Sequence, residues 1–198
     1  MHSELMNLGS LLMPNVRFMS RRDVETHFPI SPSHLISISD GEDDQALVID
    51  ARWTSVSRMF FLDGEYDEAR IEMFGTRFKI AFQDYFSMAQ ADELKRLIVG
   101  LTSSGKDIVV NCEAGRSRSA AVARFIAETS NYKLLQDTPH ANQTVLRLLR
   151  GDPILRAALR ENTQPQREGD SQTGWFKWAL TNLGLQKAHI DSDDQGTR

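Results

Sequence analysis

One cysteine and one arginine form the most reactive pair of residues in the sequence. Cys112 is the only cysteine of the 198 residues, and Arg118 follows it after five intervening residues, in the order CEAGRSRS. A cysteine attacks as its thiolate, a form that a nearby arginine and a helix N-terminus both favour. A guanidinium can hold two phosphate oxygens at once, and the hydroxyl of Ser119 could donate to the sulfur. The pattern predicts a site that binds a phosphoryl group and attacks it.

The neighbouring residues predict the elements that would hold this pair. Residues 108–110 are a β-branched apolar run typical of a buried strand, and small or apolar residues recur at helical spacing from Ser119 onward. Between them, Gly115 lets the backbone approach closely, so that loop N–H groups converge on an anion in front of the helix. Arg116 either favours polyanionic substrates or faces solvent. The candidate phosphate-binding residues are Glu113, Ala114, Gly115, Arg116, Ser117 and Arg118.

Residues 110–120, VNCEAGRSRSA, resemble the phosphate-binding loop of the cysteine-dependent protein tyrosine phosphatases. The resemblance is closest to the compact dual-specificity branch and its bacterial and phage relatives, and it covers roughly residues 16–159. It implies a phosphocysteine intermediate on Cys112, transition-state binding by Arg118 and the loop amides, and release of the thiolate assisted by Ser119. It also implies that the substrate is phosphotyrosine or phosphoserine/threonine in proteins, and that no metal or cofactor is needed.

One position departs from the pattern of that family. Most members have a histidine directly before the cysteine, where this chain has Asn111. The histidine is linked to ordering the loop and keeping the thiol acidic; an asparagine at this position can still hydrogen-bond to the loop backbone. The departure motivates an alternative, a phosphate-binding module that has lost turnover. Sulfur transfer by a rhodanese-like loop is a weaker alternative, because the arginine spacing and the following serine suit phosphate better.

The family mechanism also needs an aspartate that protonates the leaving oxygen. In the family this residue follows a strand well upstream of the cysteine, and the strand predicted over residues 56–62 ends at Asp63, which we take as the acid. Asp63 and the glycine after it would also suit an ordinary turn. Asp67 on the same loop and Asp84 are rivals. Apolar residues at helical spacing predict a helix over residues 68–85, which would place Asp84 on the surface.

Strands and helices alternate along the chain, which predicts an α/β domain with a central, mostly parallel sheet of four or five strands flanked by helices. The expected strands cover residues 16–19, 34–39, 56–62 and 108–110. The expected helices cover residues 20–28, 68–85, 89–101, 142–150 and 153–160, besides the one that begins at Ser119. Residues 131–140 are expected to be a loop. The crossover rule places the Cys112 loop at the carboxyl edge of a central strand, as in dual-specificity phosphatases.

Composition divides the chain into three parts. Residues 1–160 form the predicted phosphatase-like catalytic domain, residues 161–173 a polar linker, and residues 174–198 an aromatic segment with a disordered tail. We do not expect the aromatic side chains of Trp175, Phe176 and Trp178 to stay exposed. They would dock on the catalytic domain, pair with a second subunit or bind a partner.

Net charge, cysteine content and targeting features limit the partners and the compartment that we expect for this protein. The formal net charge of −4 argues against a nucleic-acid or anionic-membrane protein. A single cysteine excludes an internal disulfide and suits a reducing compartment. The N-terminal stretch lacks the features of a signal peptide, no stretch approaches the length of a membrane span, and the five histidines show no metal-ligand spacing. We therefore expect a cytoplasmic protein whose partner is a phosphorylated protein or peptide.

Overall fold

The computed structural model of the chain describes residues 13–163. Within them, five strands form one sheet in the order β3-β2-β4-β1-β5, and every pair of neighbours is parallel. The strands are β1 (Asn15–Ser20), β2 (Ser33–Ser39), β3 (Ser55–Phe60), β4 (Asp107–Cys112) and β5 (Lys133–Leu134). The α/β class expected from the sequence is thus confirmed. The predicted aromatic segment, with Trp175, Phe176 and Trp178, lies outside the described residues.

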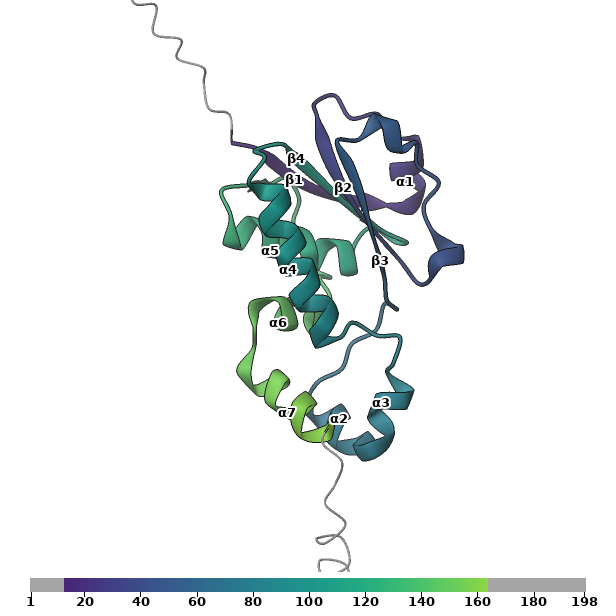
Figure 1. Ribbon diagram of the computed structural model, residues 1–198, viewed down its shortest axis with the longest axis vertical. Helices are drawn as coiled ribbons and strands as arrows, with labels where there is room; N and C mark the ends of the chain where they lie inside the picture. The colour runs from purple at the N-terminus through teal and green to yellow at the C-terminus, as the bar shows by residue number, and fades with distance from the viewer. Residues whose placement is uncertain (1–12, 164–198) are drawn as a thin grey trace, which may run out of the picture. The chain divides into compact units, whose positions relative to one another are not determined.

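Helices cover both faces of the sheet (Figure 1). α4 (Met88–Thr102), α5 (Arg118–Thr129) and α6 (Gln143–Arg150) share a hydrophobic core with one face of the sheet. α1 (Arg21–Thr26) belongs to the other face, where Val24 and Val109 are buried in a smaller cluster. Val110 and Cys112 belong to the larger core. The side chain of Cys112 therefore points to the face that α5 covers.

Three further helices gather beyond the carboxyl end of β3 (Figure 1). They are α2 (Glu68–Phe74), α3 (Phe78–Ala81) and α7 (Pro153–Thr163), and both α2 and α3 contact α7. Single 3₁₀ turns occur at η1 (Glu42–Asp44), η2 (Asp50–Arg52) and η3 (Gly75–Arg77). α7 continues to Thr163, so residues 161–163, at the start of the predicted linker, are helical. None of the helices in residues 13–163 combines the length and apolar character needed to cross a membrane.

Polar side chains fix where the helices begin. Ser20 caps α1 by accepting a hydrogen bond from the backbone N–H of Asp23, as its position in the sequence predicts. Ser87 and Gln90 form a capping box at α4. Asp152 accepts hydrogen bonds from two N–H groups of the first turn of α7 and so caps this helix. These local signals explain why most helix starts were predicted within one or two residues.

The predicted continuous helix over residues 68–85 is wrong. The segment is divided into α2, η3 and α3, because Gly75 has a φ of 50° and ends α2. Its apolar stripe still packs inward, with Ile71 and Phe78 buried in the larger core. Asp84 follows α3 in a turn, where its carbonyl accepts a hydrogen bond from Leu62 N–H at 2.8 Å. Its side chain is exposed, as expected, although the helix that predicted this exposure is absent.

The expected loop over residues 131–140 contains a strand. Lys133 and Leu134 form β5, which pairs with Asn15 and Val16 at the edge of the sheet. Two residues are too few for a period-2 pattern to be visible in the sequence. With β5 on the outside of β1, β4 has two strands on either side and is the centre of the sheet.

Candidate active site

The carboxyl end of the central strand β4 carries the cysteine. Cys112 is the last residue of β4, and the parallel register places it opposite Ser20 at the end of β1. Its side chain is buried, and its Sγ lies 3.1 Å from the hydroxyl oxygen of Ser119 in the first turn of α5. In doubly wound sheets, ligands bind at this edge, where loops leave the strands. The fold thus brings the thiol and the hydroxyl together at a position suited to binding.

The loop between β4 and α5 has its backbone donors unpaired. None of the N–H groups of residues 113–117 donates a hydrogen bond to another of the described residues. The carbonyls at the two ends of the loop are occupied, because Glu113 accepts from Arg21 N–H and Ser117 accepts from the N–H groups of Ala121 and Asn142. Backbone N–H groups are strong donors, and in a loop that reaches the surface they stay open to solvent or to a ligand. The loop therefore offers a run of donors to a ligand that accepts hydrogen bonds.

Gly115 fixes this loop against β1. Its φ is 63°, and a β-carbon there would lie 2.2 Å from the backbone nitrogen of Ser20 and 2.4 Å from the carbonyl carbon of Met19. Such distances are far inside van der Waals contact, and the positive φ strains any other L-residue. The glycine that the sequence singled out is thus required by the close approach of two backbones.

The guanidinium of Arg118 is buried with only one end hydrogen-bonded. Arg118 is 2% exposed, and its Nη1 donates to Asp40 Oδ1 at 2.6 Å and to the carbonyl of Phe61 at 2.5 Å. Its Nε is buried without a hydrogen-bond partner and lies 3.9 Å from Asp63 Oδ2. Nη2 makes no hydrogen bond to a described residue. The edge formed by Nε and Nη2 is therefore available for two oxygens of one anion.

Asp63 contacts the same loop. Its Oδ1 accepts hydrogen bonds from Ser117 Oγ at 2.7 Å and from Asn142 Nδ2 at 3.1 Å. Asn142 also donates to the carbonyl of Gly64 at 3.2 Å and caps α6 by accepting from Val145 N–H. The structure therefore brings Asp63, Arg118 and the loop together at one edge of the sheet.

The rival aspartates have no contact with this loop. Asp67 is the N-cap of α2, where its Oδ1 accepts a hydrogen bond from Arg70 N–H at 2.9 Å. Asp84 is exposed in the turn after α3, and its nearest polar side-chain contact is Gln83 Nε2 at 3.5 Å. Of these three aspartates, Asp63 alone contacts the loop.

Sequence reasoning missed two residues of this arrangement, Asp40 and Asn142. Asp40 follows β2, and Asn142 precedes α6; each lies far from Cys112 in sequence. The sequence shows Asp40 as an acidic residue directly after a strand. Its contact with Arg118 could not be predicted, because it depends on β2 lying next to β4 in the sheet. Asn142 was recognised as the beginning of a helix, and its contact with Asp63 follows from the tertiary fold.

Asn111 does not make the hydrogen bond to the loop that an asparagine could make at this position. Its side chain is 1% exposed, and its Oδ1 is buried without a hydrogen-bond partner. No hydrogen bond joins the Asn111 side chain to the loop among residues 13–163. Successive residues of a strand point to opposite faces, so Asn111 faces away from the core that contains Cys112. The loop is held instead by Gly115, Arg21 and Asn142.

Charged side chains surround the outer part of the loop. Arg21 forms ion pairs with Asp44, with Glu25 at 3.3 Å and with Glu113 at 3.4 Å. The hydrogen bond to Asp44 is the main cause that raises the pKa of Arg21, followed by its other acidic neighbours against the opposing effect of desolvation. Arg116 is exposed and forms no ion pair with a described residue. Arg116 is thus an exposed cation of the loop that no described carboxylate pairs with.

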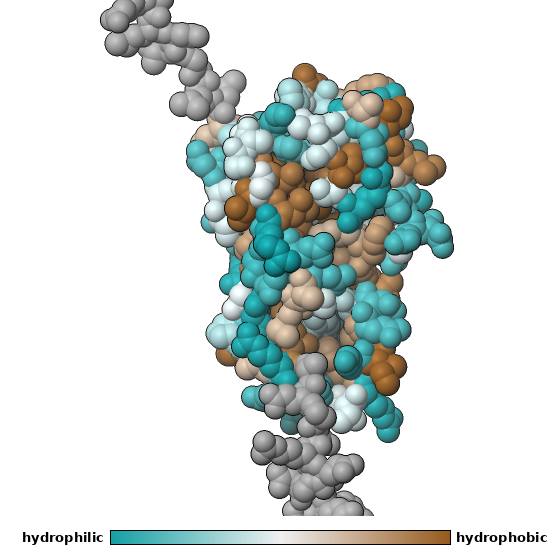
Figure 2. All heavy atoms as spheres, in the orientation of Figure 1, coloured by the Kyte–Doolittle hydropathy of each residue, from teal (hydrophilic) through white to brown (hydrophobic). Residues whose placement is uncertain are grey.

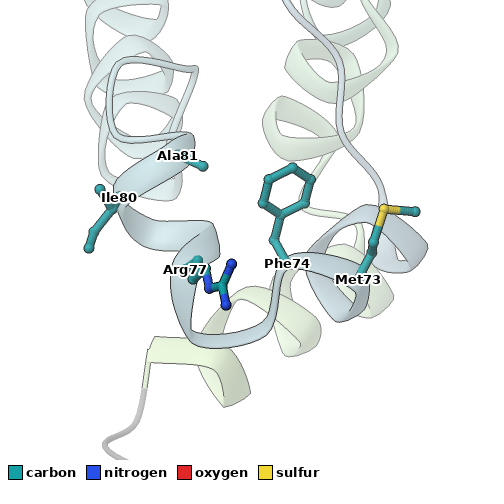
Figure 3. Close-up of a pocket in the computed structure, with 5 residues that line it drawn as sticks. All are labelled: Met73, Phe74, Arg77, Ile80 and Ala81. Atoms are coloured by element: carbon teal, nitrogen blue, oxygen red, sulfur yellow. The ribbon is translucent and has the colours of Figure 1, made fainter.

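Concave and apolar surfaces also occur away from this loop. Figure 2 shows apolar side chains reaching the surface both near the sheet and near the end that holds α2 and α3. A pocket at that end is lined by residues of α2, η3 and α3 (Figure 3), namely Met73, Phe74, Arg77, Ile80 and Ala81. No residue of the Cys112 loop lines it. The candidate chemistry and this pocket are therefore separate features.

No protein-family model matches the chain, and no curated protein matches it in sequence.

Proposed function

We propose that the chain is a cysteine-dependent phosphatase, which hydrolyses phosphate monoesters through a phosphocysteine intermediate. The observation that carries the proposal is the loop after Cys112, whose N–H groups donate to none of the described residues, together with the edge of Arg118 that makes no hydrogen bond. Donors on the backbone and on a fixed guanidinium match the three equatorial oxygens of a phosphoryl group in transfer. The resemblance of residues 110–120 to the phosphatase loop supports the same chemistry.

In the first half-reaction, the Cys112 thiolate attacks phosphorus and the bond from phosphorus to the ester oxygen breaks. Asp63, in its protonated form, gives its proton to the departing oxygen, so that an alcohol or phenol leaves. Arg118 and the N–H groups of the loop hold the equatorial oxygens throughout the displacement. The products of this step are the free alcohol and a phosphocysteine.

In the second half-reaction, water attacks the phosphocysteine. Asp63, now a carboxylate, takes a proton from the water, and the bond between sulfur and phosphorus breaks to release inorganic phosphate. The electron pair of that bond returns to sulfur as a thiolate. The hydroxyl of Ser119, 3.1 Å from the sulfur, is placed to donate a hydrogen bond to it. One carboxyl group thus serves as acid and then as base.

The substrates that we propose are phosphoproteins, with phosphate on tyrosine, on serine or threonine, or on both. This choice rests on the resemblance to the dual-specificity branch. A pull-down with Cys112→Ser or Asp63→Ala, which retain the anion site and lack turnover, would collect phosphorylated proteins. Elution by vanadate or inorganic phosphate is the expected result, because both compete for the loop. Capture that resists both anions would argue against binding at this site.

Hydrolysis of p-nitrophenyl phosphate tests the reaction directly. Cys112→Ser should lower the rate by at least about 10³-fold, since the nucleophile is lost. Circular dichroism and a thermal melt would confirm that the variant is folded. A folded Cys112→Ser variant with wild-type turnover would refute the phosphocysteine mechanism.

A second candidate function is a phosphate-binding module without turnover. The observation that favours it is Asn111, whose buried Oδ1 has no partner and which makes no hydrogen bond to the loop. Such a module would bind a phosphotyrosine peptide with micromolar or tighter affinity while releasing no inorganic phosphate from it. Turnover that depends on Cys112 would exclude this candidate.

A further inference from the structure

The buried cation of Arg118 has one close carboxylate partner. A guanidinium stays charged at every accessible pH, and burial of an unpaired charge is strongly unfavourable. Arg118 is 2% exposed, and Asp40 Oδ1 lies 2.6 Å from its Nη1. The carboxylate of Asp63 is farther away, at 3.9 Å from Nε. Asp40 is therefore the main counter-ion of the arginine.

The anchor for Nη1 is built from two neighbouring strands. Asp40 follows β2, and Phe61, whose carbonyl is the second acceptor of Nη1, follows β3. The backbone N–H of Phe61 donates to the carbonyl of Ser39 at 3.0 Å, so the two strand ends are themselves joined. A guanidinium that donates to two acceptors on a fixed frame has little freedom to rotate.

We infer that Asp40 is the positioning residue that orients Arg118 for phosphate. Its contact with Nη1 holds the guanidinium so that the opposite edge, Nε and Nη2, meets two phosphoryl oxygens. This inference rests on the proposed function, because it assigns a role within the same site. Asp40 acts through Arg118 and does not exchange a proton with the substrate. The side chain of Asp40 is 49% exposed, so solvent reaches this carboxylate while it pairs with the buried cation.

The roles of Asp40 and Asp63 are distinguishable because the two carboxylates contact different parts of Arg118. Asp40 contacts Nη1, whereas Asp63 lies towards Nε, on the edge left for the phosphoryl group. Loss of an acid slows substrates with poor leaving groups more than substrates with good ones. Loss of arginine orientation slows both kinds equally, because the equatorial oxygens are the same in each.

The test measures kcat and KM of Asp40→Ala and Asp40→Asn with p-nitrophenyl phosphate and phenyl phosphate. Asp43→Ala is the matched control, since it removes a charge from the same segment, is exposed and contacts no site residue. We expect Asp40→Ala to lower kcat by about 10²-fold for both substrates. Asp40→Asn should recover most of this loss, because its amide oxygen still accepts from Nη1. Asp43→Ala should stay within about 2-fold of wild type.

A double-mutant cycle shows whether the effect passes through Arg118. In an Arg118→Lys background, Asp40→Ala should cause little further loss, because Lys has no planar fork to orient. An unchanged effect of Asp40→Ala in that background would overturn the inference. A loss larger for phenyl phosphate than for p-nitrophenyl phosphate would overturn it too, since Asp40 would then act as the acid. Wild-type kinetics in Asp40→Ala would have the same consequence.

Phosphate binding separates failure of this inference from failure of the proposed function. If the wild-type chain hydrolyses neither ester, the proposed function fails, and titration of inorganic phosphate by calorimetry tests Asp40 instead. Weaker binding by Asp40→Ala than by Asp43→Ala supports the positioning role, and equal binding overturns it. Absence of phosphate binding to the wild-type chain overturns both proposals. If Asp40→Ala does not fold, Asp40→Asn decides instead. A small loss of kcat is expected in the wild-type background and none in the Arg118→Lys background, and equal losses in the two backgrounds would overturn the inference.

Discussion

The Sγ of Cys112 and the hydroxyl oxygen of Ser119 are 3.1 Å apart, and both side chains are buried. One residue ends β4 and the other lies in the first turn of α5, so the contact spans the loop that would hold the phosphate. A hydroxyl at this distance can donate to a thiolate. In the proposed mechanism the thiolate forms again when the phosphocysteine is hydrolysed. The contact is therefore expected to matter most in the second half-reaction.

Ser119→Ala should slow breakdown of the phosphocysteine more than its formation. We expect kcat for p-nitrophenyl phosphate to fall about 10-fold or more, with a rapid initial burst of p-nitrophenol that approaches one per active site. Stopped-flow absorbance measures the burst, and a thermal melt checks the fold. A variant with reduced kcat and no burst would show that Ser119 acts in the first step instead.

Asp63→Asn should remove the general acid. Because an acid contributes about 10² to 10⁴-fold, the rate with phenyl phosphate should fall by this factor, and the rate with p-nitrophenyl phosphate by less. Asp67→Asn is the matched control, since asparagine caps a helix as well as aspartate does, and Asp84→Asn tests the remaining rival. If Asp67→Asn or Asp84→Asn shows the larger, leaving-group-dependent loss, the assignment to Asp63 is wrong.

The parts of the site that lie close together in sequence could be predicted from it. Cys112, Gly115 and Arg118 belong to one short segment, whose strand, loop and helix patterns are each visible without tertiary information. Asp63 was chosen because it follows a strand, and its contact with Ser117 is consistent with that choice. Its catalytic role stays a prediction.

Other parts depend on how distant segments meet. Asp40 contacts Arg118 only because β2 lies next to β4, and the order of strands in a sheet is not encoded in any local pattern. The two-residue strand β5 has no periodicity to detect. The predicted helix over residues 68–85 was wrong because its apolar residues keep their helical spacing past Gly75. The helix ends there because Gly75 adopts a positive φ, which the pattern of apolar residues does not reveal.

Asn142 is expected to support Asp63 independently of its role as a helix cap. Asn142→Ala removes both the cap and the donor to Asp63, and should cost about 1 kcal/mol of stability. Asn142→Ser keeps a capping oxygen but lacks the amide that reaches Asp63. We therefore expect kcat to fall by a similar factor, about 10-fold, in both variants. Urea unfolding should show that the serine variant is the more stable; full activity in that variant would exclude a role for the amide.

His34 should make folding stability depend on pH between neutrality and mild acid. Burial, with a smaller contribution from the charge of Lys106, lowers its pKa from the ordinary value of 6.5. Its two ring nitrogens lie 2.7 Å from Ser55 Oγ and 2.8 Å from Ser104 Oγ. Between the ordinary and the lowered pKa the unfolded chain binds more protons than the folded chain. The contribution of neutral His34 to folding stability is therefore complete above pH 6.5, and it is lost as the pH falls through the lowered pKa of the folded state.

Urea unfolding of the wild-type chain and His34→Gln at several pH values between 5 and 8 measures this effect. The free energy of unfolding should decrease less steeply towards low pH in the variant. Part of the wild-type slope should remain, because burial and the charge of Arg17 also lower the pKa of His27. Identical slopes in the two proteins would show that His34 titrates alike in the folded and unfolded states.

Gly115→Ala should destabilise the fold much more than Gly105→Ala. Both glycines have nearly the same φ, 63° and 65°, so each substitution incurs the strain of a left-handed residue, about 1 to 2 kcal/mol. At Gly105 nothing lies within 4 Å of the added β-carbon, whereas at Gly115 it would meet the backbone of Ser20 at 2.2 Å. Relief of this overlap should cost a further 1 to 3 kcal/mol or so.

The same substitution should displace the loop from β1, and with it the N–H groups that would bind phosphate. We expect Gly115→Ala to lose phosphatase activity even where urea unfolding shows that it is still folded, while Gly105→Ala keeps wild-type kinetics. The pair is a controlled comparison because the backbone strain is shared and the overlap with Ser20 is not. Equal losses of stability in the two variants would mean that β1 can move to accept the β-carbon, and that the close approach of the two backbones is not required.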